Sequence, residues 1–236
     1  MKPYQHSRIS AHVFGGIWSD YQPVHDWFDQ TKASLAIMAH RAALHSSDFG
    51  KMLCLQVFGT HIVNTDQKRI SVEDIALQHI EDDLGAFTPV ADWLDHVPAP
   101  RWLDENERMV PPDLAGLDEH PEQFLADRFG GDPITFTPLV AWFDQTKRYY
   151  EGPKHRVLLH NAFGAFLAEQ VFGTLVHPRP DRAVGVRDIA EMIIMVRTGH
   201  IPTLQDLFGR IPIQPWMHGA TVVEKGRSRP VPELAD

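Results

Sequence analysis

Histidine and aspartate side chains recur at helical spacing in the first half of this chain. His25 and Asp29 are four residues apart, and His79 precedes Asp82 and Asp83 by three and four residues. Residues at these spacings share one face of an α-helix. Neutral imidazoles and carboxylates are the ligands that divalent transition metals prefer, and helix bundles build metal sites by presenting them inwards. We therefore interpret His25, His79, Asp82 and Asp83 as candidate ligands for a divalent metal: Zn, Mn, Ni or Mg.

Three more polar residues in the same half are candidates for a catalytic role: His40, Lys32 and Arg41. A divalent ion lowers the pKa of its bound water and polarises the group to be cleaved. In such a site, His40 would complete the ligand shell or move protons. Lys32 and Arg41 would neutralise the anionic oxygens of a substrate.

A tandem repeat provides an internal comparison for these residues. The hexapeptide WFDQTK occurs at residues 27–32 and again at 142–147, and matches on either side extend the similarity. The offset is 115 residues through His45 and His160, and 114 residues from Phe49 and Phe163 onward. A fixed repeat defines the folding unit. We predict repeat 1 over residues 6–103 and repeat 2 over residues 121–217. An acidic, proline-containing linker (104–120) joins them, and a flexible tail (218–236) follows.

The two repeats differ at the four candidate metal ligands. Repeat 2 replaces them with Val140 for His25, Ile193 for His79, Val196 for Asp82 and Arg197 for Asp83. If these positions faced solvent, there would be little reason for the second copy to carry hydrocarbon there. We infer that they face inwards, and that repeat 1 holds a polar pocket that repeat 2 has filled. Buried histidine and aspartate are costly unless paired or metal-bound, so the pocket is either a paired network or a site.

Five polar residues are kept in both repeats and are better explained as determinants of the fold. They are Asp29, Lys32, His40, Arg41 and His45, which recur as Asp144, Lys147, His155, Arg156 and His160. An aspartate bonded to an arginine or a histidine can tie two helices together without any substrate. The catalytic interpretation of His40, Lys32 and Arg41 therefore stands beside a structural one.

Apolar residues recur at helical spacing far more often than they alternate, so the predicted fold is mainly α. One helix is expected to begin with Ser19 or Asp20 as its N-cap. A break is expected near residue 37, because repeat 2 has Pro153 there and proline interrupts a helix. After a short hairpin, a further helix would begin at Ser71 and end at Gly85. We expect the two repeats to pack about a pseudo-twofold axis as a two-lobed domain.

The composition limits the classes of partner. A net charge of −9 and a pI near 5.8 disfavour a broad nucleic-acid surface, although local basic clusters leave a small anionic ligand or a host protein open. The chain shows no secretory signal, no apolar run of the ~18 residues that a membrane helix needs and no nucleotide cofactor motif. The single cysteine, Cys54, lies in an apolar run and is expected to be a buried core thiol. We expect a cytoplasmic protein.

A resemblance follows from the motifs of repeat 1. The patterns H-x-W-F-D-x-x-K from His25, H-R-A-x-x-H from His40, F-G at residues 58–59, I-x-x-x-H-x-x-D-x-x-G from Ile75 and D-W-L at residues 92–94 occur in order. Together they resemble an uncharacterised domain-of-unknown-function family of phage and bacterial proteins, here present as a tandem duplication. Members usually carry the motif once with an Arg-His-Arg core, and Ala39 replaces the first arginine here. The resemblance implies no activity.

Two functional hypotheses remain. The first is a metal-dependent hydrolase of a phosphoester or nucleotide-like substrate, with its site in repeat 1. The second is a non-catalytic module of phage or mobile-element origin that binds a small ligand or a protein. A closed polar cavity between His25 and His79 would favour chemistry, whereas an exposed aromatic patch at Trp18 or Trp102 would favour a binding partner. A purely structural role remains if the polar residues are fully paired with each other.

Overall fold

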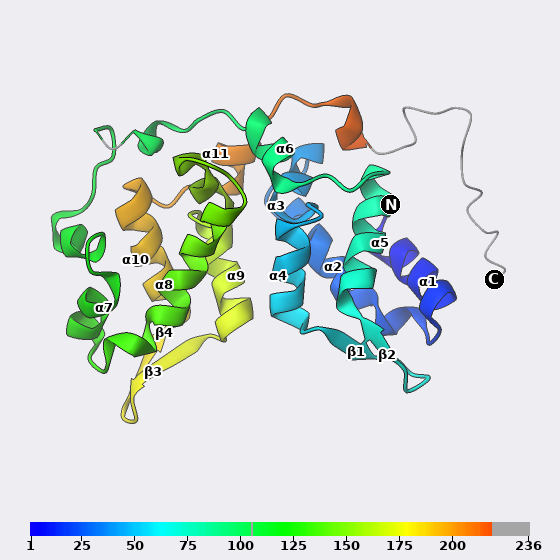
Figure 1. The fold of residues 1–236 in the computed structure, drawn as a ribbon, viewed down its shortest axis with the longest axis horizontal. Helices are drawn as coiled ribbons and strands as arrows, with labels where there is room; N and C mark the ends of the chain where they lie inside the picture. Colours follow the sequence, from blue (N-terminus) through cyan, green and yellow to red (C-terminus); the bar gives the residue numbers. More distant parts are fainter. Residues whose placement is uncertain (105, 219–236) are drawn as a thin grey trace. The chain divides into compact units, whose positions relative to one another are not determined.

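The computed structural model describes residues 1–104 and 106–218, which are mainly helical with two short antiparallel hairpins (Figure 1). The chain divides into two compact units. Unit 1 contains residues 1–93 and the chain from residue 212, and unit 2 contains residues 94–211. The predicted linker therefore belongs to unit 2, where Leu114 and Leu117 are buried. Of the predicted tail, residues 219–236 lie outside the described residues. The pseudo-twofold packing of the repeats stays a prediction.

Unit 1 is built from short helices around one hairpin. The α-helices are α1 (Pro3–Phe14), α2 (Gln22–Asp29), α3 (Arg41–Leu44), α4 (Phe49–Phe58) and α5 (Val72–Leu84). The single-turn 3-10 helices are η1 (Trp18–Asp20), η2 (Gln30–Ala33), η3 (Met38–His40) and η9 (Pro215–His218). Strands β1 (His61–Val63) and β2 (Arg69–Ser71) pair with Ile62 opposite Ile70. Helix α6 (Val90–His96) crosses the boundary between the units in sequence.

Unit 2 repeats this order of elements. Its α-helices are α7 (Pro121–Phe129), α8 (Thr137–Asp144), α9 (Ala162–Phe172), α10 (Val186–Thr198) and α11 (Leu204–Phe208). Its 3-10 helices are η4 (Arg101–Leu103), η5 (Pro112–Leu117), η6 (Pro133–Thr135), η7 (Gln145–Arg148) and η8 (Pro153–Leu158). Strands β3 (Leu175–Arg179) and β4 (Arg182–Gly185) form the second hairpin. Over the described part of the chain, no helix has the length and hydropathy needed to cross a bilayer.

Local sequence signals explain where several of these elements begin and end. The Ser71 hydroxyl accepts a hydrogen bond from the Asp74 amide at the start of α5, and Gly85 ends the helix at φ 70°. The predicted break near residue 37 is confirmed, since Ile37 is extended and η3 follows it. The predicted N-cap of the helix before it is wrong: α2 begins after Tyr21, and the Asp20 carboxylate accepts instead from the Thr65 amide in the hairpin turn. The first helix, α1, was not anticipated.

The repeated hexapeptide forms the same core in both units. Trp27 meets Phe58 edge-on with ring centroids 6.3 Å apart, and Trp142 meets Phe172 in the same way at 6.0 Å. Such edge-to-face pairs add to the stabilisation from burying the rings. Phe28 is fully buried, and its ring stacks on His79, so this core forms one wall of the polar cluster.

A glycine in α4 provides a first prediction. A Cβ at Gly50 would lie 1.7 Å from the Leu44 carbonyl oxygen, and the counterpart in repeat 2, Gly164, is 1.8 Å from Leu159 O. Gly50→Ala is therefore expected to lower the free energy of unfolding by roughly 3 kcal/mol, as overpacking does. Gly59→Ala is a comparison for backbone strain alone: no described atom lies within 4 Å of its Cβ, so only its conformation (φ 77°, ψ −172°) costs roughly 1–3 kcal/mol. Urea denaturation measures both, and a loss below about 1 kcal/mol in Gly50→Ala would contradict the close contact.

Candidate metal centre in the first repeat

Helices α1, α2 and α5 and the segment through η3 and α3 bring a cluster of polar side chains together inside unit 1 (Figure 1). The cluster contains His6 and Ser10 from α1, His25 and Asp29 from α2, His40, Arg41 and His45 around α3, and His79 and Asp83 from α5. All nine residues are buried. Buried polar groups need partners, so the contacts of each atom decide what the cluster can do.

Four of these residues form a group that could hold a metal ion: Asp29, His45, His79 and Asp83. His45 Nε2 lies 3.1 Å from His79 Nε2, 3.3 Å from Asp83 Oδ2 and 3.8 Å from Asp29 Oδ1. His79 Nε2 is 3.9 Å from Asp83 Oδ2. In a tetrahedral zinc site with bonds of about 2.0–2.1 Å, ligand atoms are about 3.3–3.4 Å apart. The two distances from His45 to His79 and to Asp83 are close to this value, and all four ligand atoms lie within 4.8 Å of one another, so Asp29 would have to move closer to complete the geometry.

Atoms without hydrogen bonds gather at the same place. Among the described residues, the buried atoms Asp29 Oδ1, Asp83 Oδ2 and His40 Nε2 make no hydrogen bond. His40 Nδ1 donates to Ile37 O at 2.7 Å, and His40 Nε2 faces Asp29 Oδ1 at 3.8 Å. The two carboxylate oxygens both lie within 3.8 Å of His45 Nε2 with hydrogen-bonding capacity left, which a cation would satisfy.

Basic groups hold the carboxylates in place, and the N-terminal ammonium of Met1 lies 2.7 Å from Asp83 Oδ1. Arg41 Nη2 lies 3.1 Å from Asp83 Oδ2, while Nη1 donates to Asp83 O at 2.9 Å and to Met217 O at 2.8 Å. Lys32 Nζ lies 2.5 Å from Asp29 Oδ2. The Lys32 side chain is 40 % exposed, so the Asp29 side of the cluster lies closest to solvent. Met217 and its neighbour Trp216, which packs edge-on against Trp93, come from the end of repeat 2 but belong to unit 1.

The protonation states suit metal ligands. Burial lowers the pKa of His45 to about 4 and the pKa of His79 well below its ordinary value, so both imidazoles are neutral near pH 7. Burial alone would raise the pKa of Asp83, but hydrogen bonds from His45 and His6 outweigh it and the pKa is lowered. For Asp29, burial is likewise outweighed by His40 and Lys32, which lower its pKa. Two neutral imidazoles therefore face two carboxylates.

Two histidines outside the four-residue group have pKa values shifted in opposite directions. Burial, together with the neighbouring His6, lowers the pKa of His25 to about 3. Burial would also lower the pKa of His6, but its hydrogen bonds to Asp82 and Asp83 reverse the effect and raise it. The carboxylates therefore favour the protonated form of His6, whereas burial disfavours that of His25.

The structure separates the predicted ligands into two groups. His79 and Asp83 belong to the four-residue group, whereas His25 lies behind His79 with the two Nδ1 atoms 3.0 Å apart. Asp82 lies at the edge, where it contacts His6 and Gln78. Of the residues interpreted as fold determinants, Asp29 and His45 lie in the group. Of the catalytic candidates, His40 faces Asp29, and Lys32 and Arg41 pair with the carboxylates.

Sequence reasoning missed His6 and Ser10, although a signal for them exists. At the offset of 115 residues, His6 corresponds to Pro121 and Ser10 to Leu125. This is the same exchange of polar for apolar residues that identified His25 and His79. Extending the repeat comparison into α1 would have found both residues.

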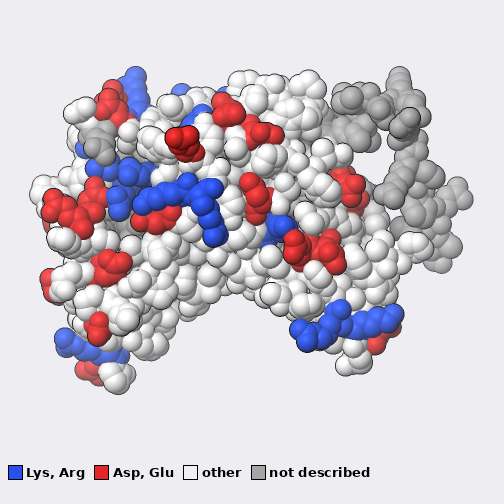
Figure 2. Space-filling view, in the orientation of Figure 1, with Lys and Arg blue, Asp and Glu red and all other residues white. Residues whose placement is uncertain are grey.

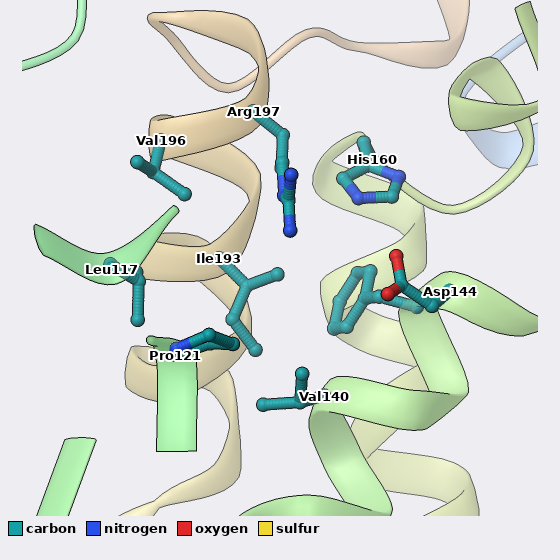
Figure 3. Close-up of a pocket in the computed structure, with 9 residues that line it drawn as sticks. Leu117, Pro121, Val140, Asp144, His160, Ile193, Val196 and Arg197 are labelled. Carbon is teal, nitrogen blue, oxygen red and sulfur yellow. The ribbon is translucent and has the colours of Figure 1, made fainter. Parts of the chain in front are cut away.

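Repeat 2 has a small pocket at the equivalent place. Its lining contains the repeat 2 counterparts of eight residues in or beside the cluster. They are Pro121 (for His6), Val140 (His25), Phe143 (Phe28), Asp144 (Asp29), His160 (His45), Ile193 (His79), Val196 (Asp82) and Arg197 (Asp83). Figure 3 shows Leu117, Pro121, Ile193 and Val196 on one side and Asp144 and His160 on the other, with Arg197 between them and Val140 below. Arg197 forms an ion pair with Asp118. Burial confirms the inferred inward orientation for His25, His79 and Asp83, while Asp82 is partly exposed.

The surface carries mixed charge. On the face shown in Figure 2, acidic and basic side chains are interspersed. This face therefore lacks the continuous positive potential with which proteins attract nucleic-acid phosphates.

The fold and the cluster define a mainly helical protein of two repeats, the first of which encloses histidine and aspartate around a potential metal position. The chain belongs to the family described as Domain of unknown function (DUF6915), whose profile matches residues 1–103 and 119–217. The prediction of a tandemly duplicated, uncharacterised domain is thereby confirmed. No curated protein and no solved structure matches the chain significantly.

Proposed function

We propose that repeat 1 binds one divalent transition metal ion through Asp29 Oδ1, His45 Nε2, His79 Nε2 and Asp83 Oδ2. The observation that carries this proposal is the pair of buried carboxylate oxygens without hydrogen bonds among the described residues, which face two neutral imidazoles at ligand spacing. Lys32 and Arg41 offset the charges of the two carboxylates, with Arg41 Nη2 3.1 Å from Asp83 Oδ2, but neither Asp29 Oδ1 nor Asp83 Oδ2 accepts a hydrogen bond from a described residue. A divalent ion between them would use this remaining capacity.

The ligand types favour particular ions. Two imidazole nitrogens with two carboxylate oxygens suit Zn²⁺ first, and Mn²⁺ or Ni²⁺ next. Mg²⁺ prefers oxygen ligands and keeps several water molecules, so a buried site with two histidines disfavours it. Arg41 and Lys32 support the ligands from behind, as outer-shell partners of metal sites do.

For this centre we propose the function of a metal-dependent hydrolase of a phosphoester or nucleotide-like substrate. His40 supports this function, because its Nε2 atom lies 3.8 Å from Asp29 Oδ1, a position from which an imidazole could exchange a proton with a bound water. Lys32 lies on the solvent side of Asp29, where an anionic group would arrive. Arg41 is occupied by Asp83 and two carbonyl oxygens, so we assign it to holding the ligand and not to substrate.

Metal analysis of protein purified without a histidine tag tests the centre. One Zn²⁺ per chain is expected by native mass spectrometry, and free zinc at 100 times its Kd should stabilise the fold by about 2.7 kcal/mol. His45→Gln should weaken zinc binding by at least 100-fold, because it removes a ligand. His160→Gln, the same change in repeat 2, should leave the affinity unchanged. Substoichiometric metal and no shift in Tm with Zn, Mn, Ni or Mg would contradict the proposal.

Turnover separates the two candidate functions. The metal-loaded protein is expected to hydrolyse a chromogenic phosphomonoester or phosphodiester, and His40→Gln should lower kcat while zinc stays bound. Bound zinc with no turnover would favour the alternative, a non-catalytic module of phage or mobile-element origin that binds a small ligand or host protein. That alternative is supported by Tyr4, Ile17 and Trp18, which are large apolar residues exposed near the start of unit 1. Trp102, by contrast, is buried. A cytoplasmic location stays a prediction.

A further inference from the structure

A chain of hydrogen bonds leads from the surface of α5 to the metal centre. Gln78 Oε1 lies 2.6 Å from Ser10 Oγ, and Ser10 Oγ lies 2.8 Å from His25 Nε2. His25 Nδ1 is 3.0 Å from His79 Nδ1, and His79 Nε2 is 3.1 Å from His45 Nε2. Gln78 is half-buried and the other members are fully buried. Each contact therefore has to join one donor to one acceptor.

The orientation of the Gln78 amide determines which atom donates in each of these hydrogen bonds. Its Nε2 atom faces two acceptors, Asp82 Oδ2 at 3.2 Å and His6 O at 3.5 Å, so this atom is the amide nitrogen. Gln78 Oε1 is then an acceptor, and the single hydroxyl proton of Ser10 must point towards it. Ser10 Oγ can only accept from His25, so the proton of the neutral His25 ring is on Nε2.

The same reasoning assigns the proton positions on the rings of His25 and His79. With its proton on Nε2, His25 offers a lone pair on Nδ1, so His79 Nδ1 must donate. The neutral His79 ring then carries a lone pair on Nε2, the atom that belongs to the four-residue group. We propose that Gln78, Ser10 and His25 are positioning residues that hold His79 in the Nδ1–H form and so keep Nε2 available to the metal. This inference rests on the proposed metal centre.

Repeat 2 supports a joint role for these residues. It replaces Gln78, Ser10, His25 and His79 with Met192, Leu125, Val140 and Ile193. All four positions have lost their hydrogen-bonding groups together. Asp29 and His45, which are not among the three positioning residues, are retained as Asp144 and His160. The positioning residues are therefore present where the ligand histidine is present and absent where it is absent.

Metal binding should affect the two ligand histidines differently. In the metal-free protein, His45 Nε2 has to donate to the lone pair of His79 Nε2. A metal ion needs a lone pair on both atoms, so the proton of His45 must move to Nδ1, which has no hydrogen bond among the described residues. His79 needs no such change. Outer-shell partners orient metal-binding histidines in this way, because they hold the proton on the ring nitrogen that does not bind the metal.

The ¹⁵N chemical shifts of the histidine rings, measured on the full chain with and without Zn²⁺, test the proposal. The metal-free protein is expected to show His79 protonated at Nδ1 and His45 at Nε2. Zinc should move the proton of His45 and leave that of His79 in place. Ser10→Ala removes the acceptor of His25 Nε2–H, so the proton should move from Nε2 to Nδ1 in His25 and from Nδ1 to Nε2 in His79. The zinc affinity should then fall about 10- to 100-fold.

Ser7→Ala is the matched control. Ser7 is equally buried on α1, but its hydroxyl contacts Pro3 O and Gln22 Oε1, so neither ring protonation nor zinc affinity should change. Ser10→Thr keeps the hydroxyl and should restore both. If Ser10→Ala fails to fold, Gln78→Met removes the acceptor of Ser10 at a half-buried position and should give the same reversal.

The outcomes distinguish this inference from the metal centre itself. His79 protonated at Nε2 in the metal-free wild type, or an unchanged zinc affinity in both Ser10→Ala and Gln78→Met, would overturn the positioning role. The expected ring protonation without any zinc binding would support the positioning of His79 and overturn the metal centre.

Discussion

Replacing Asp83 by asparagine is expected to abolish zinc binding and to lower the free energy of unfolding by roughly 3–5 kcal/mol, as when one partner of a buried ion pair is removed. Asp83 is the carboxylate that Arg41, His6 and His45 all approach. Without its charge, the guanidinium of Arg41 stays buried with backbone carbonyl oxygens as its remaining partners. Urea denaturation and zinc titration of the metal-free protein measure the two effects.

The control for this experiment is Glu81→Gln. Glu81 is exposed on the same helix, so its replacement should change stability by no more than about 0.5 kcal/mol and leave zinc binding intact. A loss below about 1 kcal/mol in Asp83→Asn would mean that the Asp83–Arg41 pair is not the buried charge pair described above.

Acidification should destabilise the metal-free protein steeply below pH 6.5. The pKa of a histidine in the unfolded chain is about 6.5, whereas burial lowers it to about 3 for His25 and about 4 for His45, and well below its usual value for His79. Between these values the unfolded chain binds more protons than the folded one. The stabilisation is therefore complete above pH 6.5 and is lost as the pH falls. Each such histidine contributes a slope of about 1.4 kcal/mol per pH unit.

Other groups modify this dependence in known directions. His155 and His160 of repeat 2 have pKa values lowered by burial, to about 4 for His155, and add to the slope. His6 has a raised pKa, so its contribution is present at low pH and is lost as the pH rises through that value. The lowered pKa values of Asp29 and Asp83 add stability that is lost only below about pH 4.

Stability measured by urea denaturation from pH 7 to 4.5 tests this prediction. His25→Val introduces the residue of repeat 2 and removes one titrating group, so the slope should decrease by about 1.4 kcal/mol per pH unit. His12→Gln changes an exposed histidine of α1 and should leave the slope unchanged. A flat profile in the wild type, or an unaltered slope in His25→Val, would show that these rings are not buried in neutral form.

Much of the fold was predictable, because its signals are local. The repeat, the helix between Ser71 and Gly85, and the break near residue 37 each follow from residues adjacent in sequence, and the structure contains all three. Helix α1 was missed, since its apolar residues are few and its inward face is polar, with His6, Ser7 and Ser10 buried. A helix that buries histidine and serine has no hydrophobic period to detect. Residues 94–103 of repeat 1 pack in unit 2 and residues 212–217 of repeat 2 pack in unit 1, because short segments carry no local signal of the core they join.

The candidate site also has features that the sequence predicts and features that only the folded structure defines. Comparing the repeats at His25 and His79 was enough to infer burial from sequence, because hydrocarbon replaces both in the other copy and burial belongs to each position separately. The same comparison was wrong at Asp82, which is partly exposed although Val196 replaces it. Which of these residues meet cannot be inferred in this way. Asp29 and His45 join His79 and Asp83, while His25 stands behind them, because the packing of α2, α3 and α5 sets the distances between their atoms. Coordination and hydrogen bonding depend on tenths of an ångström between residues far apart in sequence, and only the folded chain defines those distances.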